Sequence, residues 1–177
     1  MLKRALFISI LVAPLLFTAT AGANETPIGQ PVVVDHIIVG AVYLQPVHMA
    51  PLVEGMDQPA DVHLEADIHA DKDNPDGFQP GDWIPYLTVS YEVTKAGTDW
   101  RTFGWFMPMT AQDGPHYGAN VKLDGPGKYH LSLRILPPSY NGFFRHTDKE
   151  TGVAPWWPPI EEGWDFPFAG VGKKGGY

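Results

Sequence analysis

The ten-residue segment "DVHLEADIHA", residues 61–70, restricts the fold of this chain more than any other feature of its sequence. Acids and histidines occupy its odd-numbered positions, and apolar residues occupy the even-numbered ones. A repeat of two residues is typical of a β-strand with one buried face, whereas a helix would spread the polar groups around its circumference. The segment therefore predicts a strand whose polar face carries a row of metal-binding side chains: Asp61, His63, Glu65, Asp67 and His69.

Several other segments also predict strands. Residues 32–44, "VVVDHIIVGAVYL", are rich in β-branched residues and predict one long strand that bends at Gly40. The segments "IPYLTVSYEV", "WRTFGWFMPM", "YGANVKL" and "KYHLSLRIL" follow, with turn-forming residues between them. Short strands at regular spacing predict an all-β fold, an immunoglobulin-like β-sandwich in a single domain. The tail after Pro137, rich in Pro, Gly and Trp, is expected to pack as long loops.

Residues 1–23 have the pattern of a secretory signal peptide. Lys3 and Arg4 precede the apolar run "ALFISILVAPLLF", and small residues follow it. The run is short and interrupted by proline, which disfavours the alternative of an uncleaved membrane anchor. We expect cleavage after Ala23, with Ala21 as the alternative site. Residues 24–177 would then form the exported domain.

Charge and composition restrict the partners of this exported domain. Cleavage removes two basic residues and no acidic one, so the formal net charge of −8 becomes −10. Such an acidic balance disfavours nucleic acid and anionic lipid as partners and favours cations. The chain contains no cysteine, so a metal site must use His, Met and carboxylate ligands, and a blue-copper site is disfavoured. A serine hydrolase is unsupported because the sequence has no G-x-S-x-G motif.

Three places in the sequence group metal-binding residue types. They are His63 with Glu65 on the predicted strand, Met107, Met109 and His116 in "FMPMTAQDGPHYG", and His146 in the polar loop "FFRHTDKETG". Imidazole nitrogen with thioether sulfur suits copper, particularly Cu(I), and a glutamate adds a hard oxygen for Fe(II), Mn(II) or Zn(II). Each place alone is ordinary, since methionines near strand ends are often core residues.

Other polar residues have weaker signals. His48 lies beside Met49 in a loop and remains open as a ligand. Asp67 and His69 continue the polar face beyond Glu65; we expect them to be solvated, with a path into the site as the alternative. His130 alternates with the apolar residues of "KYHLSLRIL", which predicts that it faces outward.

Seven motifs occur in a fixed order along residues 39–168. They are "GAVYLQPV", "DVHLEADIHA", "WIPYL", "FMPM", "DGPHYGAN", "PPS" and "RHTDKETGVAPWW". Together they resemble the periplasmic high-affinity iron-transport protein family, also called the Fe2+ transport protein family. The resemblance covers nearly the whole exported domain.

The resemblance implies a function and a set of ligands. It implies an immunoglobulin-like β-sandwich homodimer in the periplasm that works with an inner-membrane iron permease. It also implies a copper site close to a second position for iron, which Mn or Zn can replace. The family's metal-site residues fall on His63, Glu65, Met109, His116 and His146. His146 follows the last predicted strand in an extended loop, so we expect it to complete the copper site of the other subunit at the dimer interface.

The sequence leaves several functions open. The same five residues would serve delivery of iron to a permease, a copper-dependent ferrous iron oxidase, or periplasmic copper storage and resistance. A sugar-binding module is a different alternative, because Trp156, Trp157 and Trp164 would offer flat aromatic platforms on a β-sandwich. Copper and iron binding is the prediction that the ligand set favours.

Overall fold

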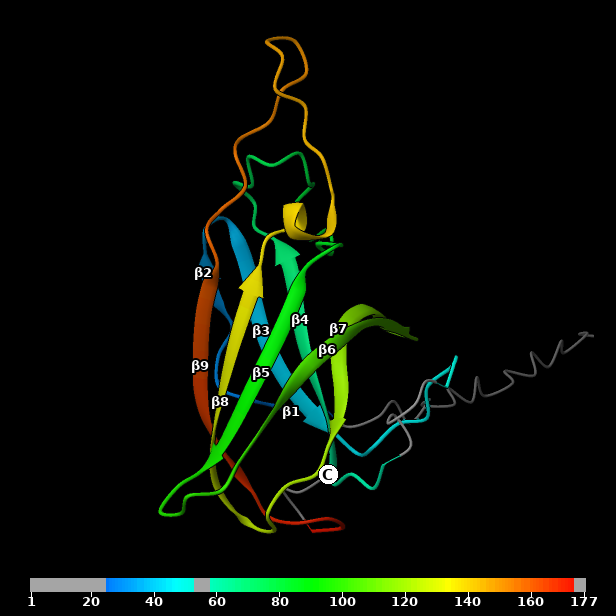
Figure 1. Cartoon of the computed structure of the whole chain (residues 1–177), viewed down its shortest axis with the longest axis vertical. Helices are drawn as coiled ribbons and strands as arrows, with labels where there is room; N and C mark the ends of the chain where they lie inside the picture. The colour runs from blue at the N-terminus through cyan, green and yellow to red at the C-terminus, as the bar shows by residue number, and fades with distance from the viewer. Residues whose placement is uncertain (1–24, 53–57, 174–177) are drawn as a thin grey trace, which may run out of the picture.

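The computed structural model describes residues 25–52 and 58–173, which form two packed layers of antiparallel strands (Figure 1). In chain order the elements are β1 (Thr26–Pro27), β2 (Val32–Val34), β3 (Ile37–Leu44), β4 (Val62–Ala70), β5 (Thr88–Lys95), β6 (Arg101–Ala111), β7 (Gly114–Val121), β8 (Gly127–Leu136), the 3-10 helix η1 (Pro138–Asn141) and β9 (Ile160–Phe168). The predicted signal peptide lies outside the described residues. Within those residues, no helix has the length and apolar character needed to cross a bilayer.

One strand connects the two layers. The hydrogen-bonded order is β1-β3-β4-β7-β6-β5-β8-β9, with β2 also paired to β3. Residues 107–111 of β6 pair with β7, and residues 101–106 of the same strand pair with β5. The sheet therefore curls at β6 into a sandwich, and Figure 1 shows β6 crossing from β5 towards β7. This confirms the predicted all-β, immunoglobulin-like sandwich.

Aromatic residues join the layers. The ring of Tyr43 on β3 lies 5.6 Å from the ring of Phe166 on β9. The hydroxyl of Tyr117 on β7 donates to the carbonyl of Ile84 at 2.9 Å and accepts from the N–H of Leu87 at 3.0 Å. A buried hydroxyl with both partners ties the segment before β5 to β7. The two hydrogen bonds of Tyr117 hold β7 in place, and β7 is the strand that pairs with β4.

The predicted single strand over residues 32–44 is wrong. Those residues form a hairpin of β2 and β3, in which Asp35 and His36 turn the chain at φ values of 45° and 62°. Two successive positive φ angles are those of a type I′ turn, which matches the twist of a two-residue hairpin. The apolar runs on both sides hid the turn in the sequence. Gly40 lies inside β3, opposite Asp67.

The predicted tail of loops after Pro137 is also wrong in one part. β9 pairs with β8 along its whole length and forms the edge of the second layer. Its buried residues alternate, with Trp164, Phe166 and Phe168 facing the core. Pro167 is tolerated because an edge strand can leave one side of its backbone unpaired.

Trp156, Trp157 and Trp164 do not form the flat exposed platforms that a sugar-binding module would need. Trp157 and Trp164 are only 7% and 9% exposed. The indole N–H of Trp164 donates to the carbonyl of Gln30 at 2.9 Å, and Trp156 packs against Phe143 with ring centroids 5.9 Å apart. Because these three rings pack within the protein, they do not offer the flat exposed platforms that suggested a sugar-binding module.

Candidate metal centre

Strand β4 lies between β3 and β7, and its polar face is buried at His63 and Glu65. His63 is fully buried and Glu65 is 6% exposed. The alternation predicted from the sequence is confirmed, but the row of polar residues is not a solvated surface. Buried ionisable groups need partners, hydrogen bonds or a metal.

The register of three strands brings the predicted ligands to one face. On β4 and β7, His63 pairs with Asn120 and Glu65 pairs with Gly118. On β6 and β7, Met109 pairs with His116. Side chains of directly paired residues lie on the same face of a sheet, and so do residues two apart on one strand. Four of the five predicted ligands therefore converge: His63, Glu65, Met109 and His116.

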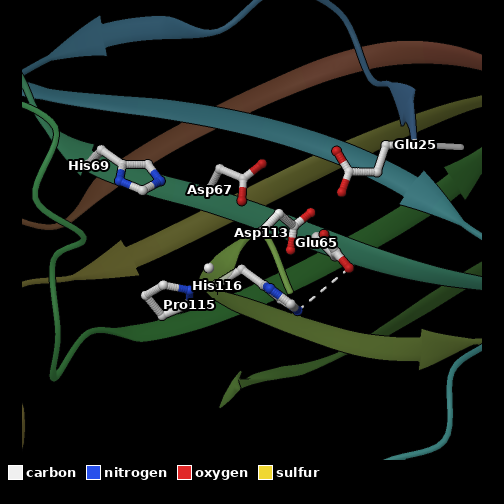
Figure 2. A pocket seen from close by; sticks show the side chains of 8 residues that line it. Glu25, Glu65, Asp67, His69, Asp113, Pro115 and His116 are labelled. Atoms are coloured by element: carbon white, nitrogen blue, oxygen red, sulfur yellow. Dashed lines mark ion pairs between the residues drawn. The ribbon is translucent and has the colours of Figure 1, made fainter. Parts of the chain in front are cut away.

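The donor atoms of His63, Glu65 and His116 have the spacing of a metal site. Oε1 of Glu65 lies 3.5 Å from Nε2 of His63 and 3.5 Å from Nε2 of His116, and Figure 2 marks the second contact. One donor atom from each residue lies within 4.8 Å of the others. A tetrahedral ion with bonds of about 2.0–2.1 Å holds its donors about 3.4 Å apart. Both Nε2 atoms are buried without a hydrogen-bond partner among the described residues, which fits a metal ligand.

Asn120 fixes the orientation of His63. Its Oδ1 accepts the N–H of Val47 at 3.1 Å, and its Nδ2 donates to the carbonyl of Val47 at 2.8 Å. These two bonds define the amide orientation, so Oδ1, 2.9 Å from Nδ1 of His63, is an acceptor there too. Nδ1 of His63 therefore carries the proton, and Nε2 keeps its lone pair for a metal. Asn120 was not predicted from the sequence, although it alternates with His116 and Gly118 in "GPHYGAN".

Gly118 makes room for the His63 ring. A Cβ atom at this position would lie 2.7 Å from Nε2 of His63 and 3.0 Å from the carbonyl oxygen of Leu64. Only glycine therefore allows the imidazole to lie this close to the backbone of β7. Its signal in the sequence is a glycine inside a predicted strand, which often marks a close approach of this kind.

Met109 lies in the wall of a cavity of about 750 Å³ with the other three converging ligands. His48 and Met49, which follow β3, line the same cavity. Met49 is half-buried and His48 is exposed. Two thioethers, those of Met49 and Met109, are therefore gathered with the histidines around one opening.

A neighbouring cavity of about 320 Å³ collects carboxylates. Figure 2 shows Glu65, Asp67 and His69 following one another along β4, with Glu25 and Asp113 joining them from other segments. Asp67 and His69 are half-buried and line this cavity beside Glu65. Oxygen ligands of this kind suit hard divalent cations. Glu25 and Asp113 had no signal in the sequence analysis.

Burial sets the protonation of the centre. Burial first, and then the charges of Glu25, Asp67 and Asp113, raise the pKa of Glu65 to about 8. Burial, followed by a hydrogen bond and charge repulsion from Asp113, raises the pKa of Glu25 to about 7. Burial lowers the pKa of His63 to about 4. His63 is thus neutral at pH 7, as a ligand must be, and a bound cation would displace protons from the carboxyl groups.

The structure does not bring His146 to the other four residues within one chain. Its side chain is 74% exposed, on the loop of residues 143–153, which we call the His146 loop. Figure 1 shows this loop projecting beyond the sandwich at the top of the view, far from the β6–β7 hairpin.

Comparison with known proteins identifies relatives over nearly the whole chain. The model of the family described as "Fe2+ transport protein" matches residues 22–170. A UPF0423 protein of Brucella abortus (strain 2308) is 55% identical over 175 residues, which cover 94% of this chain and 95% of the relative.

Two solved structures are also similar. FetP of uropathogenic Escherichia coli strain F11 superimposes with a TM-score of 0.80 at 50% identity, covering 85% of this chain and 99% of FetP. The copper-reconstituted P19 protein of Campylobacter jejuni has a TM-score of 0.80 at 45% identity, covering 85% of this chain and 99% of P19.

Proposed function

The chain belongs to the Fe2+ transport protein family, and we propose that it is a periplasmic copper- and iron-binding protein of a high-affinity iron uptake system. The observation that carries the proposal is the buried cluster of His63, Glu65 and His116. Its two unpartnered Nε2 atoms lie 3.5 Å from one carboxylate oxygen. The copper in the similar P19 structure supports the choice of metal.

His63, His116 and Met109 are the proposed copper ligands, with Glu65 beside them. Two imidazole nitrogens and a thioether form a mixed, soft donor set that suits copper. Asn120 and Gly118 hold His63 so that its Nε2 faces the site. Bound copper would supply a redox-active centre in a largely buried position.

The carboxylate-lined cavity is the proposed position for iron, the cargo. Glu25, Asp67 and Asp113 supply hard oxygens, and Glu65 lines both cavities. The same ligands suit Mn(II) or Zn(II) as substitutes. In this proposal iron passes from the cavity to an inner-membrane permease. The acidic character of the exported domain would favour capture of cations before that step.

We propose that a homodimer completes the copper site with His146 of each chain. His146 is exposed, and its loop projects away from the β6–β7 hairpin of its own chain, so it is accessible to a second copy. In a two-fold dimer the exchange is reciprocal and gives two equivalent sites at the interface.

Subunit mixing tests this arrangement. His63→Ala and His146→Ala are each expected to lose high-affinity copper binding. Exchange of subunits between them creates mixed dimers in which one chain supplies His63 and the other supplies His146. Random exchange at equal concentrations should restore about 0.25 copper per chain, because half of the dimers are mixed and each holds one complete site.

The matched control is a mixture of His63→Ala with His116→Ala. Each variant then lacks one ligand of its own His63–Glu65–His116 cluster. No chain in the mixture has an intact cluster, so mixing should rebuild no complete site. Confirmed exchange without recovery in the first mixture would reject the shared site. Recovery in both mixtures would reject the proposed assignment of ligands to chains.

Oxidation of iron is the second candidate function. Glu65 and His116 line both the cavity with the copper ligands and the carboxylate-lined cavity, so the two metal positions share a wall. Fe(II) added to Cu(II)-loaded protein without oxygen should yield about one Fe(III) per copper in this case, and repeated turnover should require oxygen. An absence of Fe(III) in both conditions would leave binding and delivery as the function.

A further inference from the structure

The His146 loop contains a hydrogen-bonded relay. Oδ1 of Asp148 accepts the backbone N–H groups of Glu150 at 3.2 Å and of Thr151 at 2.9 Å. Oδ2 of the same carboxylate accepts the hydroxyl of Thr151 at 2.8 Å. Oγ1 of Thr151 lies 2.7 Å from Nδ1 of His146. Thr151 thus connects the carboxylate of Asp148 to the imidazole of His146.

The relay determines which nitrogen of His146 carries the proton. An ionised carboxylate only accepts hydrogen bonds, so the single hydroxyl proton of Thr151 points to Asp148. Towards His146 the threonine oxygen can therefore only accept, and Nδ1 of His146 is the donor. Nε2 is left with its lone pair. His63 has the same arrangement, with Asn120 as its acceptor.

The base of the loop is held by packing and backbone bonds. Phe143 stacks on Tyr86 with ring centroids 5.0 Å apart. Nη1 of Arg145 donates to the carbonyl of Val153 at 3.0 Å, and the N–H of Val153 donates to the carbonyl of His146 at 3.1 Å. His146 is therefore exposed on a defined structure.

We propose that Asp148 and Thr151 are positioning residues that hold His146 as the Nδ1–H tautomer, so that Nε2 is ready to bind the metal of a second copy. In water the neutral histidine side chain favours the other tautomer, with its proton on Nε2. The relay reverses that preference before any metal arrives. This inference rests on the proposed shared copper site, but its first readout needs no metal.

The test begins with the tautomer itself. In metal-free protein labelled with ¹⁵N-histidine, at a mildly alkaline pH, long-range ¹H–¹⁵N spectra report the protonated nitrogen of each neutral ring, and His146→Ala assigns the signal. We expect Nδ1–H in the unaltered protein and in Thr151→Ser. Thr151→Val removes the acceptor and should shift His146 to the Nε2–H form. Thr147→Val makes the same change elsewhere in the loop and should leave the tautomer unchanged.

Asp148→Asn provides a second variant of nearly the same shape. The amide oxygen is expected to keep the two backbone bonds, which turns the amide NH₂ towards Thr151. The threonine oxygen then accepts from the amide, and its proton turns to Nδ1 of His146. This variant should therefore also give the Nε2–H form. Persistence of Nδ1–H in both Thr151→Val and Asp148→Asn would overturn the relay.

Copper affinity of the dimer then links the tautomer to function. Thr151→Val and Asp148→Asn should weaken copper binding about tenfold, the size of effect typical of residues that orient a ligand, while Thr151→Ser and Thr147→Val should stay within about twofold. If Thr151→Val and Asp148→Asn keep the copper affinity while His146→Ala loses it, the positioning role is rejected and the shared copper site is kept. Unchanged affinity in His146→Ala as well would reject the shared copper site, and the relay's role with it.

Discussion

The four converging residues His63, Glu65, Met109 and His116, which we call the strand cluster, and the His146 loop present ligand histidines in opposite ways. His63 and His116 lie on paired strands and are 0% and 5% exposed, whereas the side chain of His146 is 74% exposed. The similarity between the two regions is chemical. In each, a side-chain oxygen 2.9 Å or 2.7 Å away engages Nδ1 and leaves Nε2 for a metal.

The two regions differ in how much structure must move when a ligand histidine is displaced. Displacing His63 disturbs the β4–β7 pairing and the core behind it, so this ligand is preorganised by the sheet. His146 is fixed by bonds within its own loop, and such local structure opens at a lower free energy than a central strand. In the proposed site the strand ligands therefore remain in place, and the loop ligand can join or leave without unfolding the core.

Gly118→Val should have the largest effect, because it breaks the preorganisation of the strand cluster. Its Cβ would meet Nε2 of His63 at 2.7 Å and the carbonyl of Leu64 at 3.0 Å. We expect copper affinity to fall more than about 100-fold, with a stability loss of about 1–3 kcal/mol from overpacking. Copper titration against a competing chelator and thermal denaturation measure the two effects.

Gly163→Val is the matched control for this change. A Cβ at Gly163 would lie 2.9 Å from both Nε2 of His130 and the carbonyl of Leu131, a similar clash on β9 away from the cluster. It should lower stability to a similar degree and keep copper affinity. Loss of copper binding in both variants would mean that general sheet distortion, and not displacement of His63, is responsible.

Asn120→Leu should have the next largest effect. It removes the acceptor of His63 and both bonds to Val47, so we expect about a 10- to 100-fold loss of copper affinity. Asn141→Leu removes two hydrogen bonds near the other end of the sandwich, to Tyr86 and Thr88, and should leave copper affinity unchanged. Equal affinities in the two variants would show that Asn120 does not orient a ligand.

The sequence predicted the strand cluster better than its surroundings. A repeat of two residues allows only two faces, so His63 and Glu65 had to share one of them. The positions of Asn120 and Gly118 depended on how β4 pairs with β7. The alternation of each strand determines which face a residue occupies, but not which residue of the other strand lies opposite it. Glu25 joins the centre from a segment far from β4 in the sequence, which no periodicity could predict.

For the His146 loop, the sequence predicted the type of structure but not its hydrogen bonds. Its polar composition and its place after Pro137 indicated an extended loop, which the structure confirms for residues 143–153. The relay from Asp148 to Thr151 was not predicted, because it depends on the turn that places residue 151 beside residue 146. Side chains in loops are positioned by such individual bonds, and composition does not encode them.

The pH dependence of stability of the metal-free protein should report the protonation of the strand cluster. Glu65 has a pKa of about 8 in the folded chain and an ordinary value of 4.5 unfolded, so between these values the folded state binds more protons. Stability therefore falls as pH rises through this window. His63, with its pKa lowered from 6.5 to about 4, has the opposite effect only below pH 6.5.

The interval from pH 6.5 to 8 therefore isolates the carboxyl groups. Metal-free protein should lose up to about 2 kcal/mol of stability over this interval, measured by urea denaturation with a chelator present. Glu65→Gln should remove most of that slope, and Glu150→Gln, on the exposed His146 loop, should keep it. A flat profile in the unaltered protein would mean that Glu65 titrates near its ordinary value.

Met109→Ile should have the smallest effect and tests whether the strand cluster discriminates between metals. Thioether sulfur is a soft donor that contributes to copper binding and little to binding of Mn(II) or Zn(II). We expect copper affinity to fall about tenfold, about 1.4 kcal/mol, with little change for the other two metals. Met107→Ile is the matched control, because Met107 lies two residues away on β6 and is 43% exposed. Selective copper loss at Met109 alone supports a ligand. An equal fall for all three metals would assign Met109 to packing. Equal copper loss in both variants would mean that Met109 is not distinguished from Met107 as the ligand.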